Sequence, residues 1–126
     1  MEIVKMESNL KMSDLYFSKC SVDRAVNVKN GDYKADLQRG IRQRGDHHYD
    51  VELKLTIEKD DLSVLVIANA HFEYKAEDYS KEESIIKTNT VAIMFPFVRS
   101  QVTLLTTQPG MSPIILPPIN ITKYES

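Results

Sequence analysis

This chain contains very little cysteine and no tryptophan: Cys20 is its one cysteine among 126 residues. A single cysteine excludes an internal disulfide and a metal site made of cysteines alone. Long apolar runs are also missing, because no stretch approaches the roughly 18 uncharged apolar residues that a membrane helix needs. The N-terminus lacks the basic segment and apolar run of a signal peptide. We therefore expect a cytoplasmic protein without membrane contact that folds as a single domain over residues 1–126.

Charge is plentiful in the first two-thirds of the chain and scarce in the last third. From residue 84 onward only Lys87, Arg99, Lys123 and Glu125 are ionised at neutral pH. The net charge of −2 gives no general attraction for nucleic acid or anionic lipid. A low-charge third of a small protein has to pack on its own domain, on another copy of the chain or on a different protein.

Four segments carry the alternation that is typical of β-strands. The clearest is residues 49–58, in which every odd position is apolar and every even position is polar. This period of two places the apolar side chains on one face of a strand and the polar ones on the other. The first segment changes parity, and a bulge between Phe17 and Cys20 would restore it. We expect four antiparallel strands with one face buried and the other facing water, at about residues 13–29, 33–42, 48–59 and 61–76.

Beyond Ser80 the apolar residues recur at steps of three and four, which predicts a helix over about residues 84–108. Pro96 lies inside this pattern, so we expect either a kink there or a helix that begins near it. A second apolar set on the opposite side gives the predicted helix two neighbours, the sheet and a partner. The first set is Val91, Met94, Phe95, Val98, Val102 and Leu105, and the second is Ile93, Phe97 and Leu104. Prolines then make residues 112–126 an extended tail.

Two motifs in the last third resemble those of the SecB export chaperones. Ile93–Arg99 reads IMFPFVR and is similar to that family's LFPYAR helix motif, and Leu116–Asn120 reads LPPIN and is similar to its following LAPVNF segment. The resemblance covers roughly residues 15–121. It implies an α+β fold: a four-stranded antiparallel sheet with one long, proline-interrupted helix packed on one face. It also implies assembly as a homodimer or a homotetramer.

Members of that family bind unfolded or nascent polypeptides in long apolar grooves and deliver them to the SecA motor. Here Ser100 follows Arg99 where the family has glutamate, and the sequence ends before the family's second helix and acidic tail. These departures argue against docking to SecA. The resemblance therefore implies a chaperone of non-native polypeptides, in protein export or outside it. The alternative is a dedicated chaperone of a single partner such as an antitoxin.

A surface that holds many different sequences needs exposed apolar area without finely placed polar groups. The candidates for contact with a client are apolar residues of the predicted strands, and ordinary core packing is the alternative for each: Tyr33, Ala35, Leu37, Tyr49, Leu65, Phe72 and Tyr74. The candidates for an oligomer interface or for helix packing are Met94, Phe95, Phe97, Val98, Arg99 and Val102. If the helix is an oligomer interface, V98D or V102D should dissociate the protein.

Other kinds of site have weaker support. An RNA-binding module would use the basic run Arg39–Arg44, but aromatic residues for base stacking are few and a solvated loop between strands is the better interpretation. His47, His48 and His71 suggest zinc, yet adjacent histidines on a strand point to opposite faces and the sequence indicates no cysteine or carboxylate to complete a ligand set. We expect no catalytic residues, no metal, no cofactor and no enzymatic activity.

Overall fold

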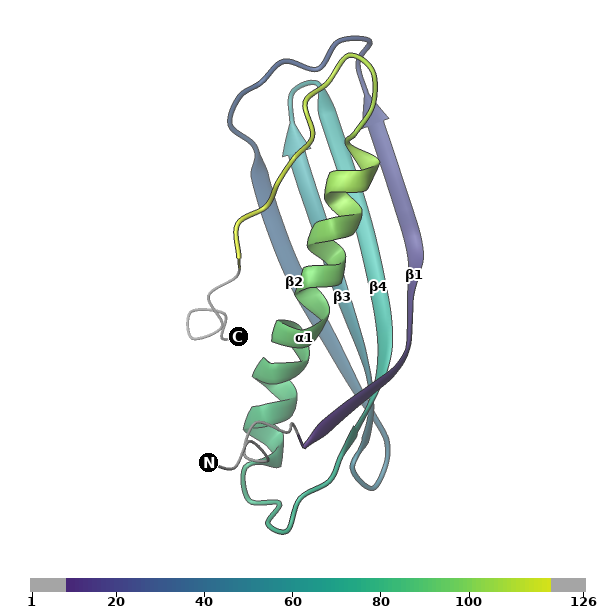
Figure 1. Cartoon of the computed structure of the whole chain (residues 1–126), viewed down its shortest axis with the longest axis vertical. Helices are drawn as coiled ribbons and strands as arrows, with labels where there is room; N and C mark the ends of the chain where they lie inside the picture. Colours follow the sequence, from purple (N-terminus) through teal and green to yellow (C-terminus); the bar gives the residue numbers. More distant parts are fainter. Residues whose placement is uncertain (1–8, 119–126) are drawn as a thin grey trace, which may run out of the picture.

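The computed structural model describes residues 9–118, and residues 1–8 and 119–126, which include the end of the predicted tail, lie outside this range. A four-stranded antiparallel sheet in the order β1-β4-β3-β2 carries one helix on one face (Figure 1). This arrangement confirms the predicted α+β fold. The elements are β1 (Leu10–Arg24), β2 (Lys34–Gly45), β3 (His48–Lys59), β4 (Leu62–Tyr74) and α1 (Glu82–Leu105).

The hairpin of β3 and β4 forms the centre of the sheet. Its alternating residues do what the pattern predicts, because every second residue of β4 from Leu62 to Tyr74 is buried. Leu53 pairs with Ala68 and Leu55 with Val66 across the two strands, so these buried residues share one face. The other face of the sheet carries the polar and half-buried residues. We call the first face the inward face and the second the outward face.

Strand β1 keeps its apolar residues on the inward face by means of two irregularities. One lies between Phe17 and Lys19, within the predicted bulge, and the second lies between Ser13 and Tyr16. Asp14 has a φ of 57°, which aspartate tolerates better than most residues. The strand ends at Arg24 and not at residue 29, because the chain beyond leaves the sheet: Val28 N–H donates to the carbonyl of Gly110 instead of to a strand.

Helix α1 has one buried side and one exposed side. Val91, Met94, Val98 and Val102 are fully buried against the sheet. The helix runs unbroken through Pro96, so a helix that begins near this residue is the wrong alternative. Pro96 is exposed, on the side of α1 away from the core, so the hydrogen bond that it removes is lost outside the core. α1, the helix of the described residues, is not apolar enough along its length to cross a membrane.

The helix does not cover the sheet evenly. It packs mainly on β4, less on β3 and β1, and hardly at all on β2. In Figure 1, β2 begins to one side of α1 and passes behind the middle of the helix, so much of the inward face of that edge strand has no helix of residues 9–118 above it.

Candidate functional site

The inward face of β2 is apolar and only partly covered. Ala35 pairs with Ile57, Leu37 with Leu55 and Ile41 with Val51, so these β2 residues share the face that carries the core. Their β3 partners are buried, whereas Ala35 is exposed and Leu37 and Ile41 are half-buried. The same alternating pattern thus produces a sealed surface on β3 and an open one on β2.

A groove of about 520 Å³ lies between the second half of β2 and the first half of α1. We call it the β2–α1 groove. Its walls combine apolar surface from Ile41, Ile86 and two tyrosine rings with polar and charged side chains, so the groove offers apolar area beside polar groups. The lining residues are Ile41, Gln43, Tyr49, Tyr79, Ser80, Glu82, Glu83, Ile86 and Lys87.

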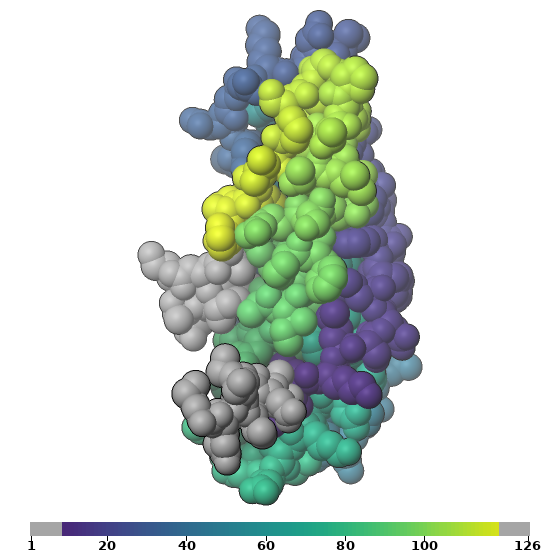
Figure 2. Space-filling model, viewed as in Figure 1, coloured from purple at the N-terminus to yellow at the C-terminus, as the bar shows by residue number. Residues whose placement is uncertain are grey.

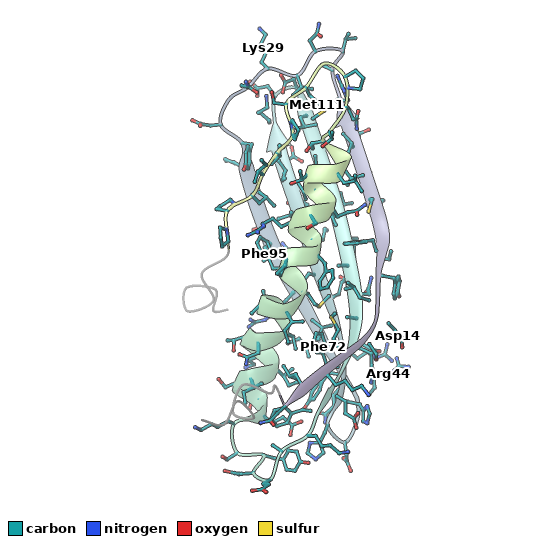
Figure 3. All side chains as sticks on the ribbon, viewed as in Figure 1. Asp14, Lys29, Arg44, Phe72, Phe95 and Met111 are labelled. Atoms are coloured by element: carbon teal, nitrogen blue, oxygen red, sulfur yellow. The ribbon has the colours of Figure 1, made fainter. Side chains whose placement is uncertain are left out.

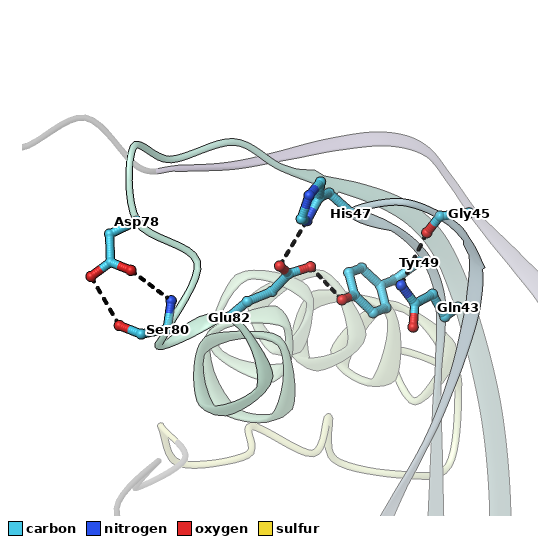
Figure 4. Close-up of polar contacts among 7 residues, drawn as sticks. All are labelled: Gln43, Gly45, His47, Tyr49, Asp78, Ser80 and Glu82. Atoms are coloured by element: carbon cyan, nitrogen blue, oxygen red, sulfur yellow. Dashed lines mark hydrogen bonds and ion pairs between the residues drawn. The ribbon is translucent and has the colours of Figure 1, made fainter.

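A hydrogen-bonded cluster closes one end of the β2–α1 groove. The Tyr49 hydroxyl donates to the Glu82 carboxylate, and Nδ1 of His47 lies 2.7 Å from Oε1 of the same carboxylate (Figure 4). Burial, together with the Glu82 carboxylate, which accepts the hydrogen bond from this hydroxyl, raises the pKa of the Tyr49 hydroxyl to about 12. The ring of Tyr79 stacks on His47 with ring centroids 3.9 Å apart. These contacts hold the first turn of α1 on β3 and fix the shape of the groove.

Hydrogen bonds within the segment before α1 also fix the start of this helix. The Ser80 N–H and hydroxyl donate to the Asp78 carboxylate at 3.0 and 2.9 Å, as Figure 4 shows. These donors hold the pKa of the Asp78 carboxyl below its ordinary value. Halfway along the strand, Arg39 reaches from the inward face of β2 and donates to the backbone carbonyl of Lys87 at 2.5 Å. The width of the groove is therefore set by direct links between β2, β3 and α1.

A second apolar surface lies on the side of α1 that faces away from the sheet. Phe97 is 44% exposed and Leu104 is 68% exposed, and Ile93, at helical spacing beside them, is half-buried against the core. We call these three residues the exposed stripe. It is the second apolar set that the helical spacing predicts, and Phe97 and Leu104 leave apolar area exposed on α1.

Four of the predicted client-contact residues lie on the open side of the sheet. Ala35 and Leu37 lie on the inward face of β2, and Tyr33 directly precedes this strand on the same side. Tyr49 lines the β2–α1 groove. Leu65 is separated from them, because it lies on the outward face of β4 opposite Thr56.

The structure places two of the predicted client-contact residues, Phe72 and Tyr74, in the core and not on the surface. They are 0% and 2% exposed, so neither presents surface to a client. Phe72 lies between the sheet and α1 (Figure 3). Both are core residues, the alternative that the sequence left open. The β3–β4 alternation places them directly under the helix layer, and β4 is the strand that α1 covers most fully.

The residues predicted for an oligomer interface or for helix packing also divide into buried and exposed ones. Met94, Val98 and Val102 are fully buried against the sheet and Phe95 is 7% exposed, so these residues serve helix packing. V98D or V102D would place a charge in the core of the monomer, so neither change tests an oligomer interface separately from the fold. Of the predicted residues only Phe97, with the half-buried Arg99, remains at the surface.

The basic run is also placed differently from the prediction. Residues 39–44 belong to β2 and do not form a loop. Arg39 lies on the inward face and is bonded to α1, whereas Arg42 lies on the outward face opposite Asp50. Arg44 pairs with Asp50 at 3.4 Å. Cations on two faces of a strand do not make one continuous phosphate-binding surface.

The histidines follow the prediction that neighbours point apart. His47 faces Glu82, while a ring nitrogen of His48 lies 3.0 Å from one of His71 on the outward face. The sequence missed that Asp50 lies beside His71, at 3.0 Å, because only the strand register brings them together. The hydrogen bond to His71 holds the pKa of the Asp50 carboxyl below its ordinary value. Within residues 9–118, no group of three or more histidine, cysteine, aspartate or glutamate side chains is arranged to hold a metal ion.

Sequence reasoning also missed part of the groove. Ile41 and Ile86 line it, yet neither was among the predicted contacts. The signal for Ile41 was present, since it continues the odd-numbered apolar positions of Tyr33, Ala35 and Leu37. Ile86 gave no signal, because only the packing of α1 places it beside β2.

Known proteins share both the sequence pattern and the fold. Residues 6–124 match the family model described as preprotein translocase subunit SecB. Two curated relatives are an uncharacterized protein of Methanocaldococcus jannaschii, 40% identical over 50 residues, and the protein-export protein SecB of Saccharophagus degradans, 30% identical over 91 residues. These matches cover 40% and 68% of this chain, and they span only 32% and 54% of the two relatives.

Two solved structures share the architecture at 12% sequence identity. One is the SecB-like chaperone Rv1957 of Mycobacterium tuberculosis in complex with a ChAD peptide from the HigA1 antitoxin, with a TM-score of 0.72 over 89% of this chain and 88% of that one. The other is a protein of unknown function from Streptococcus agalactiae, with a TM-score of 0.54 over 86% of this chain and 96% of that one. The family match extends over nearly the whole sequence and the fold agrees with it. The chain therefore belongs to the SecB family of chaperones.

Proposed function

We propose that this protein holds non-native polypeptides and that the β2–α1 groove is where it binds them. The observation that carries the proposal is the partly covered inward face of β2, with exposed Ala35 and half-buried Ile41 beside a groove of about 520 Å³. Apolar surface of this kind binds by burial and not by a particular hydrogen-bond pattern, so it accepts many sequences.

The affinity expected from such a groove suits a holding chaperone. Each large apolar side chain of a client that becomes buried contributes about 1.5–3 kcal/mol. Several such contacts, reduced by the cost of ordering the client, amount to about −8 kcal/mol, which corresponds to micromolar binding. Binding at this strength is reversible, as a protein that releases its clients requires.

We also propose that the protein assembles into a homodimer or homotetramer through the exposed stripe of α1. Phe97 and Leu104 expose apolar area at the surface of α1. Assembly would bring several grooves together and raise the avidity for one long client by effective concentration.

Two narrower forms of the function differ in the number of clients. A general chaperone, in protein export or outside it, suppresses the aggregation of several unrelated unfolded proteins. A dedicated chaperone protects a single partner. The structural neighbour that binds an antitoxin peptide supports the second form as the alternative.

The test is an aggregation-suppression assay with a panel of reduced, unfolded proteins, run with the wild type, I41E and Q38E. Ile41 lines the groove, and Gln38 is exposed on the outward face of the same strand, so Q38E adds the same charge away from the groove. We expect I41E to lose protection and Q38E to retain it. Equal protection by both variants would place the binding surface elsewhere, and protection of a single protein would favour the dedicated form.

A further inference from the structure

The segment that follows α1 is extended and lies beside the open strand. Residues 112–118 run back along the second half of α1, between that helix and the start of β2 (Figure 1). The space-filling view shows the same path: these yellow residues lie against the green helix and beside the blue residues that precede and begin β2 (Figure 2). The segment thus occupies the part of the open side that the β2–α1 groove does not.

The side chains of this segment alternate as those of an extended peptide do. Leu116 is 5% exposed and Ile114 is half-buried against the core, whereas Ile115 between them is 76% exposed. Tyr33, at the start of β2, lines a cavity of about 260 Å³ together with Met111 and Ile114. Apolar residues two positions apart are therefore buried, and the intervening Ile115 is mostly exposed at the rim of this cavity.

The backbone of the segment is held at one point. The Thr103 hydroxyl donates to the carbonyl of Ile114 at 2.8 Å, and the Ile114 N–H donates to the Thr106 hydroxyl at 2.8 Å. Pro113, Pro117 and Pro118 have no N–H to donate, so the segment does not pair with β2 as a further strand. A few side chains and one backbone anchor make a contact that a competing chain is able to replace.

We propose that residues 112–118 occupy the first half of the client site as an internal substitute for a client. A client that displaces them gains the whole inward face of β2, from Tyr33 to Ile41. The chemistry of the substitute defines the client class: an extended segment with large apolar side chains two residues apart. This inference rests on the function proposed for the β2–α1 groove and adds a competition to it.

Hydrogen exchange on the wild-type protein tests the competition without any substitution. A synthetic peptide with large apolar residues at every second position is the ligand, and a peptide of the same composition with its apolar residues in adjacent pairs is the control. We expect the alternating peptide to slow exchange in β2 and to speed exchange at the Ile114 amide, which loses its bond to Thr106. The paired-residue peptide should bind more weakly.

Substitution of the segment gives the second arm. L116S removes the buried anchor, and I115S is the matched control at the exposed neighbour. If the segment competes, L116S should bind the alternating peptide roughly threefold or more tightly, since a larger fraction of the site is open. I115S should bind as the wild type does. Thermal unfolding establishes that each variant is folded, and the exchange experiment decides the matter if L116S is not.

The outcomes separate the two ideas. If the wild type binds neither peptide nor unfolded proteins, the proposed function fails and the competition fails with it. If the wild type binds the alternating peptide while the Ile114 amide stays protected and folded L116S binds no more tightly, the groove is a client site and residues 112–118 are only part of the core.

Discussion

The two halves of the inward face, β3–β4 and β2, have the same alternation of apolar and polar residues but differ in how far their apolar residues are buried. On β3 and β4 the apolar positions are sealed under α1: Leu53 and Phe72 are both 0% exposed. On β2 the equivalent positions remain partly open, because α1 packs on the other three strands and hardly reaches this one. The difference teaches that an apolar stripe becomes core or binding surface according to what is placed above it. One sheet therefore provides both stability and a site.

The largest expected effect comes from charging the covered half. V98D places a carboxylate at a position that is 0% exposed and should lower the free energy of unfolding by about 4 kcal/mol or more. S100D, at an exposed polar position of the same helix, should change it by less than about 1 kcal/mol. Urea denaturation measures both. A stable, folded V98D protein would contradict the division between covered and open regions.

Truncation to alanine sharpens the comparison between β3 and β2. L53A removes a fully buried side chain and should cost about 2–5 kcal/mol of stability. I41A removes a half-buried side chain at the groove and should cost about 1 kcal/mol, yet weaken peptide binding more than other surface changes do. Urea denaturation and fluorescence titration with a labelled apolar peptide measure the two quantities. If I41A loses as much stability as L53A, the inward face of β2 is core and not a site.

The exposed stripe predicts a change in mass without a change in fold. F97D should abolish or strongly weaken self-association, because it places a charge on the exposed apolar stripe of α1. S100D is the matched control, since Ser100 is an exposed polar residue one position beyond the half-buried Arg99. Sedimentation velocity checks the mass of each variant. An unchanged mass for F97D would remove α1 from the interface.

A smaller effect is expected at the closed end of the groove at high pH. Because folding raises the pKa of Tyr49 from 10.0 to about 12, the folded state holds this proton more tightly than the unfolded state. Its contribution to stability is full below pH 10 and is lost as the pH rises toward 12. Y49F has no hydroxyl to titrate, so its stability should fall less steeply over that interval. Denaturation curves at several pH values measure the slopes, and parallel slopes would contradict the link.

Particular residues show how far the sequence reaches. The alternation at 49–57 and 62–74 predicts two strands and their buried side, and the helical spacing of Val91, Met94 and Val98 predicts the side of α1 that packs. Local geometry is enough for these features, since a period of two or 3.6 places side chains on faces without reference to the rest of the chain. The parity change near Phe17 predicted a bulge for the same reason.

The same patterns could not separate core from site. Leu37 and Phe72 are both apolar residues of an alternating strand, and only one lies under the helix. The basic run 39–44 was expected in a loop, but β2 continues through it because the hairpin register with β3 extends to His48. The pairing of Asp50 with His71 follows from cross-strand register as well. Each of these features depends on contacts between segments that are distant in the sequence.

By itself, then, the sequence determined the elements of this protein, their apolar faces and its family, because these follow from local periodicity and from two motifs. The tertiary structure decided where α1 lies over the sheet, and hence that β4 is sealed and β2 is open. The physical reason is that one helix is too narrow to cover four strands. The uncovered edge strand provides the proposed site, and residues 112–118 fill part of it.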